Sequence, residues 1–177
     1  MQVEHFDDAI SSAVRTLASG LDHDWSQPAG TLTWTCRETA DHVVDVLFSY
    51  ALQLAAEAKT AYLPYDILHA LPEARPGDIV DAMGGVGTMF AAVMSRAPDA
   101  RAWHPFGVLS VTEWAGLGAN EVVVHTFDIA AGLSIAFDPP AALCAEILDD
   151  MLALHGRTDA SNLGDDPCSA LLTLSGR

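Results

Sequence analysis

The sequence predicts an all-α protein, folded as an antiparallel four-helix bundle with an accessory C-terminal helix. Apolar residues recur at three- and four-residue steps over most of the 177 residues, which is the period of amphipathic helices. Residues that favour helix starts and stops divide this pattern into five segments. No convincing alternation of apolar and polar residues indicates strands. At this length the chain is most simply one domain, residues 1–177, with a short C-terminal tail at about residues 157–177.

The first predicted helix starts near the N-terminus and ends before Gly20, a residue that favours helix ends. The second begins near Thr35, because Thr35 and Glu38 have the spacing of a capping box, in which each side chain satisfies a free amide of the first turn. This helix should extend to about Ala61, since Pro64 prevents its continuation.

The third predicted helix begins at Pro76, a favoured first-turn residue, and runs to about Arg96. A loop follows. The fourth helix starts near Ser110, where Ser110 and Glu113 have a second capping-box spacing, and reaches about Leu133. The fifth helix follows two prolines at 139–140 and ends near residue 156; a polar segment and a short apolar tail then complete the chain.

Composition restricts the class of protein. Apolar residues make up 50% and charged residues 18% of the chain, which is typical of a globular domain. The net charge of −16 argues against nucleic acid and anionic membrane surfaces as partners. We expect no signal peptide and no membrane-spanning run of about 18–20 apolar residues. Three widely spaced cysteines, Cys36, Cys144 and Cys168, favour a reducing cytoplasm over a disulfide framework.

A carboxylate and an imidazole stand in the apolar fourth helix. Glu121 and His125 are four residues apart, so they share a helix face, and no lysine or arginine is near enough in sequence to pair with Glu121. Burying a carboxylate without a partner would cost several kcal/mol. A metal ion is the partner that would use both groups. The alternative is that the pair lies on a solvated helix face.

His42 is the best candidate for a third ligand. It lies about one turn into the second helix among apolar residues, and catalytic zinc sites take three protein ligands plus an open position. One carboxylate and two imidazoles suit zinc and other divalent metals. By itself His42 could also be an ordinary buried histidine. Glu38 has the same spacing to His42, but the capping box already explains Glu38.

Other residues have two interpretations each. Asp128, three residues after His125, is either an acceptor that orients an imidazole or a surface acid. Cys36 lies in a first helical turn, where a thiol pKa falls, but we favour a small half-buried residue over a nucleophile. Three aromatic residues of the loop before the fourth helix are either a substrate-pocket wall or a loop packed on the bundle: Trp103, His104 and Phe106.

Four segments carry a family resemblance. Trp34–Val43 resembles the second-helix signature of the mycothiol-dependent maleylpyruvate isomerase metal-binding domains, which belong to the DinB-like superfamily of four-helix-bundle metalloproteins. Asn120–Ala130 resembles their fourth-helix signature. His104–Gly107 is similar to the loop before it, and Pro167–Arg177 to the tail of small single-domain members. The likeness covers about residues 5–177, and its specificity comes from the set of short motifs.

The resemblance implies a DinB-like bundle with His42, Glu121 and His125 as ligands of one divalent metal, usually zinc. It also implies a low-molecular-weight thiol as cosubstrate, which is mycothiol in actinobacteria and bacillithiol or glutathione elsewhere. Zinc would deprotonate such a thiol and hold the thiolate in its open position. No catalytic residue beyond the metal ligands is then needed. The expected function is transfer of this thiol to a small electrophile, a reaction suited to detoxification.

The sequence departs from the named isomerase in one respect. The full isomerase resembles a two-domain protein, whereas only some twenty residues follow the fifth helix here. Thiol transfer to another electrophile is therefore favoured over maleylpyruvate isomerisation. Two other classes stay open: a non-catalytic bundle that binds metal or a small ligand, and a di-iron or di-manganese oxidase, which needs paired E-x-x-H motifs. The sequence identifies neither the electrophile nor the oligomeric state.

Overall fold

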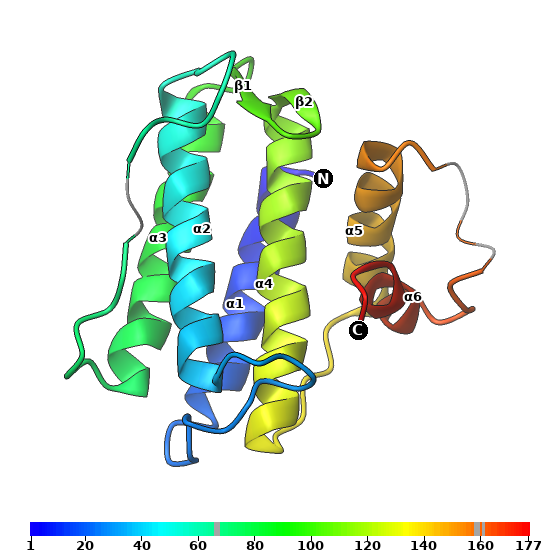
Figure 1. The fold of residues 1–177 in the computed structure, drawn as a ribbon. Helices are drawn as coiled ribbons and strands as arrows, with labels where there is room; N and C mark the ends of the chain where they lie inside the picture. Colours follow the sequence, from blue (N-terminus) through cyan, green and yellow to red (C-terminus); the bar gives the residue numbers. More distant parts are fainter. Residues whose placement is uncertain (66–67, 158–159, 161) are drawn as a thin grey trace.

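A computed structural model describes residues 1–65, 68–157, 160 and 162–177 (Figure 1). Within them the protein is mostly helical with one small two-stranded sheet. The elements in chain order are α1 (Val3–Ala18), α2 (Cys36–Ala55), α3 (Pro76–Arg96), β1 (Arg101–His104), β2 (Gly107–Ser110), α4 (Val111–Leu133), α5 (Ala141–Leu154) and α6 (Pro167–Leu174).

The four long helices pack side by side. α2 contacts α3 and α4, and α1 contacts the same two helices from the other side (Figure 1). α5 packs on the outside of α4, and α6 packs on α5. α4 thus has neighbours on three sides, which explains why it is apolar almost all round. Its Trp114 belongs to the core, as do Phe6 of α1 and Phe90 of α3, all with 0% exposure.

The helix directions differ in part from a simple antiparallel order. The backbone amide of Trp103 in β1 donates to Ala58 just past α2, so the C-terminal ends of α2 and α3 meet. The Met1 ammonium donates to the carbonyl of Thr112, so α1 and α4 begin at the same end. Neighbours α2 and α3 are therefore parallel, as are α1 and α4, while α1–α3 and α2–α4 are antiparallel. The long connection of residues 56–75 allows this, because it returns the chain to the opposite end.

Both capping boxes are confirmed. Glu38 accepts hydrogen bonds from the Thr35 amide at 2.8 Å, and the Glu38 amide donates to the Thr35 hydroxyl at 3.1 Å. Glu113 accepts from the amide of Ser110 at 2.7 Å. Glu38 is thereby engaged at the helix start, as predicted. The end of α2 was predicted too late, near Ala61. The helix stops at Ala55, where the next turn is broken by a left-handed residue with φ of 48°, Glu57.

The segment after α3 is a β-hairpin rather than the predicted loop. β1 and β2 pair in antiparallel register, with Arg101 opposite Ser110 and His104 opposite Gly107. Strands of four residues are too short for alternation to show in the sequence. Gly107 has a φ of 127°, a conformation that closes the turn and is open to glycine. The apolar tail is also structured, as helix α6. Positions 158, 159 and 161 of the polar segment before it lie outside the described residues.

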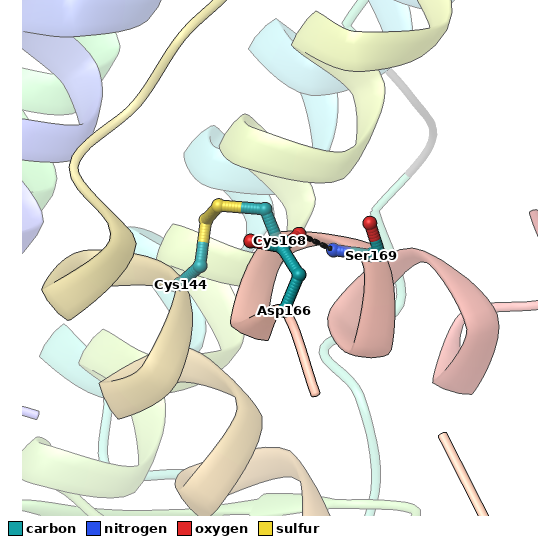
Figure 2. Close-up of a disulfide and its surroundings, with 4 residues drawn as sticks. All are labelled: Cys144, Asp166, Cys168 and Ser169. Carbon is teal, nitrogen blue, oxygen red and sulfur yellow. Dashed lines mark hydrogen bonds between the residues drawn. A yellow bond between two sulfur atoms is a disulfide. The ribbon is translucent and has the colours of Figure 1, made fainter. Parts of the chain in front are cut away.

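The expectation of unpaired cysteines was wrong for two of the three. Cys144 of α5 and Cys168 of α6 form a disulfide (Figure 2). Their separation of 24 positions hides this pairing, because only the packing of α6 on α5 brings them together. Next to the disulfide, Asp166 accepts a hydrogen bond from the Ser169 amide at 2.8 Å and caps α6 (Figure 2). Cys36 is free and buried.

One helix, α3, has the length and composition of a membrane span, with a mean hydropathy of 1.2 over its most apolar window. The sequence was expected to contain no such run. A core helix of a globular protein meets the same criterion. Here Ile79, Met83 and Phe90 of α3 are buried within the helical core, so this feature does not by itself indicate a membrane.

Candidate metal centre

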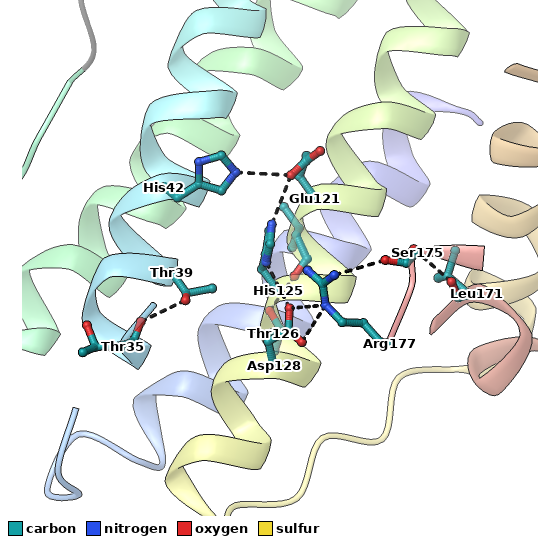
Figure 3. A network of polar contacts seen from close by, with 11 residues as sticks. Thr35, Thr39, His42, Glu121, His125, Thr126, Asp128, Leu171, Ser175 and Arg177 are labelled. Atoms are coloured by element: carbon teal, nitrogen blue, oxygen red, sulfur yellow. Dashed lines mark hydrogen bonds and ion pairs between the residues drawn. The ribbon is translucent and has the colours of Figure 1, made fainter. Parts of the chain in front are cut away.

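Two neighbouring antiparallel helices bring the three sequence-predicted ligands together. His42 comes from the second turn of α2, whose start the Thr35 capping box fixes. Glu121 and His125 lie one turn apart on the face of α4 that is turned toward α2 (Figure 3). One ligand atom from each of the three residues lies within 4.8 Å of the others. Among the described residues, no other cluster of three or more His, Cys, Asp or Glu side chains does so.

The spacing fits a bound ion better than hydrogen bonds. Oε2 of Glu121 lies 3.6 Å from Nε2 of His42 and 3.4 Å from Nε2 of His125. N–H···O hydrogen bonds usually measure about 2.7–3.2 Å. Ligands of a tetrahedral zinc ion, at bond lengths of about 2.1 Å, lie about 3.4 Å from one another. A divalent ion could therefore be held by all three residues, whose hard carboxylate and borderline imidazole donors suit zinc.

The site is largely shielded from solvent. The side chains of His125, Glu121 and His42 are 10%, 21% and 32% exposed. Burial opposes ionisation of Glu121, but the close imidazoles of His125 and His42 outweigh it and lower the pKa of this carboxyl to about 2. Burial likewise opposes the charged form of His125, yet Asp128 and Glu121 together raise its pKa. The carboxylate is thus ready to bind a cation.

Asp128 orients one ligand. Its Oδ2 lies 3.1 Å from Nδ1 of His125, and its side chain is only 5% exposed (Figure 3). With Nδ1–H donating to this carboxylate, Nε2 of His125 keeps its lone pair free on the side of Glu121. Arg177, at the end of the chain, contacts the same carboxylate through Nε, at 2.9 Å from Oδ1. Asp128 is therefore a buried acceptor rather than a surface acid.

The triad opens into cavities on more than one side. One, of about 500 Å³, is lined by Leu32, Thr33, Trp34, Arg177 and all three members of the triad. A second cavity, of about 540 Å³, shares Trp34 and His42 with the first. Its other lining residues come from α2 and from the loop after it: Arg37, Glu38, Asp41, Asp45, His69 and Ala70. The ring centroid of Trp34 lies 5.1 Å from that of His42. A small molecule could thus approach an ion at the triad.

The remaining predicted residues lie away from these cavities. Trp103, His104 and Phe106 belong to the hairpin and line none of the cavities that the triad borders. His104 is buried, packs on Tyr50, and has a pKa lowered by that burial despite the nearby carboxylate of Glu121. The geometry favours hairpin packing over a direct pocket wall.

Cys36 is fully buried, as a structural residue would be. Burial raises the pKa of its thiol, and Sγ makes only long contacts, to the carbonyl oxygens of Ile129 at 3.7 Å and Pro28 at 3.9 Å. A thiol in this state is a poor nucleophile.

Sequence reasoning missed two residues at the site. Arg177 was noted only within a tail motif, and no local pattern indicates that α6 returns it to α4. Trp34 was part of the second-helix motif but was not assigned a role. An aromatic residue just before the start of α2 could have been examined as a wall for His42, which lies within the first two turns of the same helix.

The structure defines a helical domain whose three convergent side chains could hold one divalent ion. The model of the mycothiol maleylpyruvate isomerase N-terminal domain family matches residues 7–130, and the chain belongs to this family. The match covers α1 to most of α4, which includes all three members of the triad. No significant match was found among curated proteins or among solved structures.

Proposed function

We propose that the protein is a metal-dependent transferase that joins a low-molecular-weight thiol, mycothiol first of all, to a small electrophile. Helices α1–α4 would form the four-helix bundle of the DinB-like metalloproteins. His42, Glu121 and His125 would hold one zinc ion. The observation that carries the proposal is the spacing of Glu121 Oε2 from the two imidazole nitrogens, which matches the edges of a tetrahedral zinc site. Membership of a mycothiol-associated family supports the choice of thiol.

The residues of this chain supply positioning and shielding. When bound, zinc would lower the pKa of a coordinated thiol and hold the thiolate in an open position. Glu121 contributes a negative ligand, and the two histidines contribute neutral ones once their Nε2 atoms are free of protons. Asp128 accepts a hydrogen bond from Nδ1–H of His125 and fixes its ring. Trp34 lines one side of the site, with its ring centroid 5.1 Å from that of His42.

The charge of the 540 Å³ cavity beside the triad indicates which electrophiles fit. Its wall carries three carboxylates, Glu38, Asp41 and Asp45, and one guanidinium, that of Arg37. Arg37 is already engaged, because it donates to the backbone carbonyls of the 71–74 loop. A dicarboxylate such as maleylpyruvate would meet like charges here. A neutral electrophile would not, and we propose a neutral one as the substrate.

The proposed partners are small molecules only, since a net charge of −16 disfavours nucleic acid and anionic membranes. We propose the cytoplasm as the location, where low-molecular-weight thiols are kept reduced. The Cys144–Cys168 disulfide is unusual for that compartment. Alkylation of the cysteines during cell lysis would test it, because the location predicts that these two thiols are trapped largely reduced.

Turnover by two variants tests the mechanism. Zinc-loaded protein is given mycothiol and neutral electrophiles, and loss of free thiol is followed. His125→Ala removes a ligand and should abolish turnover with the fold intact by circular dichroism. Cys36→Ser should retain most activity, since the nucleophile belongs to the cosubstrate. An inactive Cys36→Ser beside an active His125→Ala would establish a protein-thiol mechanism instead. Zinc-loaded wild type that consumes no thiol would favour a binding role.

A further inference from the structure

The C-terminal residue of the described chain reaches the metal centre. Nε of Arg177 lies 2.9 Å from Oδ1 and 3.0 Å from Oδ2 of Asp128, so one N–H is shared by both oxygens (Figure 3). The side chain of Arg177 is 22% exposed and that of Asp128 5% exposed. Arg177 also lines the 500 Å³ cavity with the triad. A largely buried ion pair thus lies directly behind His125.

The fold delivers this arginine by an ordered turn. Two residues past the end of α6, Gly176 has a φ of 75°, and this left-handed conformation reverses the chain. The Arg177 amide donates to the Leu172 carbonyl at 2.9 Å, and its Nη1 donates to the Ser175 carbonyl at 3.1 Å. The disulfide from Cys168 to α5 ties the start of the same helix to the rest of the domain. α6 is therefore anchored at its start by the disulfide, and the turn that carries Arg177 is fixed at its end.

We propose that Arg177 is a positioning residue for the metal: acting through Asp128, it holds His125 with Nε2 turned toward Glu121 and His42. The inference rests on the proposed function, because it assumes that the triad binds an ion. In this role Arg177 acts through Asp128 and not on the reacting atoms.

The chain of contacts explains why an arginine is needed. Asp128 has two oxygens, and only Oδ2 faces Nδ1 of His125. A guanidinium shared between both oxygens stops the carboxylate from rotating away, and the planar group suits this better than a flexible ammonium. Arg177 also places a positive charge beside the carboxylate of Asp128, whose side chain is only 5% exposed, and so offsets the cost of burying that charge.

Zinc affinity in a double-mutant cycle tests the proposal. Affinities of wild type, Arg177→Ala, Asp128→Ala and the double variant are measured by competition with a chromogenic chelator. Loss of a hydrogen-bond partner of a ligand costs roughly 10–100-fold in metal affinity, and we expect this for Asp128→Ala and the lower end of it for Arg177→Ala. In the Asp128→Ala background, removing Arg177 should have no further effect. Arg96→Ala removes an exposed positive charge at the end of α3 and should leave affinity unchanged.

A spectroscopic measurement separates positioning from plain stabilisation. The visible absorption of bound Co²⁺ reports ligand geometry, so Arg177→Ala should change it, and Arg177→Lys should restore it only in part. Two outcomes would overturn the proposal. One is that Arg177→Ala lowers zinc affinity by the same factor in the wild-type and Asp128→Ala backgrounds, and the other is that it leaves the Co²⁺ spectrum unchanged. If wild type binds zinc but transfers no thiol, the proposed function fails while the cycle still decides the role of Arg177. If wild type binds no zinc, both are overturned.

Discussion

Oε2 of Glu121 lies 3.4 Å from Nε2 of His125, across one turn of α4. This distance is longer than a good hydrogen bond and close to the edge of a tetrahedral zinc site. The two groups therefore face each other without satisfying each other fully. The stability of the domain should depend on what lies between them, and the first two predictions follow from this.

Zinc should raise the melting temperature. A ligand that binds only the folded state stabilises it by about 2.7 kcal/mol at a concentration of one hundred times Kd. For a domain of this size each kcal/mol shifts Tm by about 2–4 °C, so a rise of roughly 5–10 °C is expected. Circular dichroism melting of metal-free protein with and without zinc measures it. A Tm that stays the same although calorimetry shows binding would count against a site in the core.

Acid should destabilise the metal-free protein through Glu121. Burial alone would raise the pKa of this carboxyl, but the close imidazoles of His125 and His42 lower it from 4.5 to about 2. Because the pKa is lower in the folded than in the unfolded state, the stabilisation is present above about pH 4.5. It is lost as the pH falls from there to about 2.

The matched control for this pH effect is Glu121→Gln, which removes the titrating group but keeps its shape. The difference in unfolding free energy between wild type and variant, taken from urea curves at several pH values, should shrink as the pH falls below 4.5. A difference that stays constant over this range would show that Glu121 does not titrate with a lowered pKa.

Gly132→Ala should destabilise the domain. A Cβ at Gly132 would lie 2.5 Å from Sγ of Cys36 and against the carbonyl oxygen of Pro28, and backbone cannot move aside cheaply. Gly85→Ala is the control, since no atom lies within 4 Å of the added Cβ in the middle of α3. That change should stabilise by about 0.5–1 kcal/mol, the helix-propensity difference. Urea denaturation measures both, and equal effects of the same sign would contradict the close approach of α4 to the start of α2.

Loss of the disulfide should destabilise the protein. A bridge between residues 24 positions apart contributes about 3.5 kcal/mol in the chain-entropy model. The double variant Cys144→Ser, Cys168→Ser should therefore melt earlier than wild type under oxidising conditions, and the two should converge when wild type is reduced. Thiol titration of denatured, oxidised wild type should find one free thiol, that of Cys36. Three free thiols after air oxidation would argue against the bridge.

Local sequence chemistry was enough for much of the fold. Thr35 with Glu38, and Ser110 with Glu113, fix the starts of α2 and α4, because capping depends on residues only three positions apart. The four-residue spacing of Glu121 and His125 places both on one face for the same local reason. His42 needed more: its inward orientation was an inference from its apolar neighbours, and only the packing of α2 on α4 brings it within reach.

What the sequence by itself determined is the five helices α1–α5, the starting residues of α2, α3 and α4, and the shared face of the two candidate ligands Glu121 and His125 on α4. What only the tertiary structure decided is the parallel course of α2 beside α3, the disulfide from Cys144 to Cys168 and the return of Arg177 to Asp128. The physical reason is the distance along the chain over which each kind of interaction acts. Capping and helical period act within a few residues, whereas these contacts join residues 24 or more positions apart and form only when separate helices pack on one another.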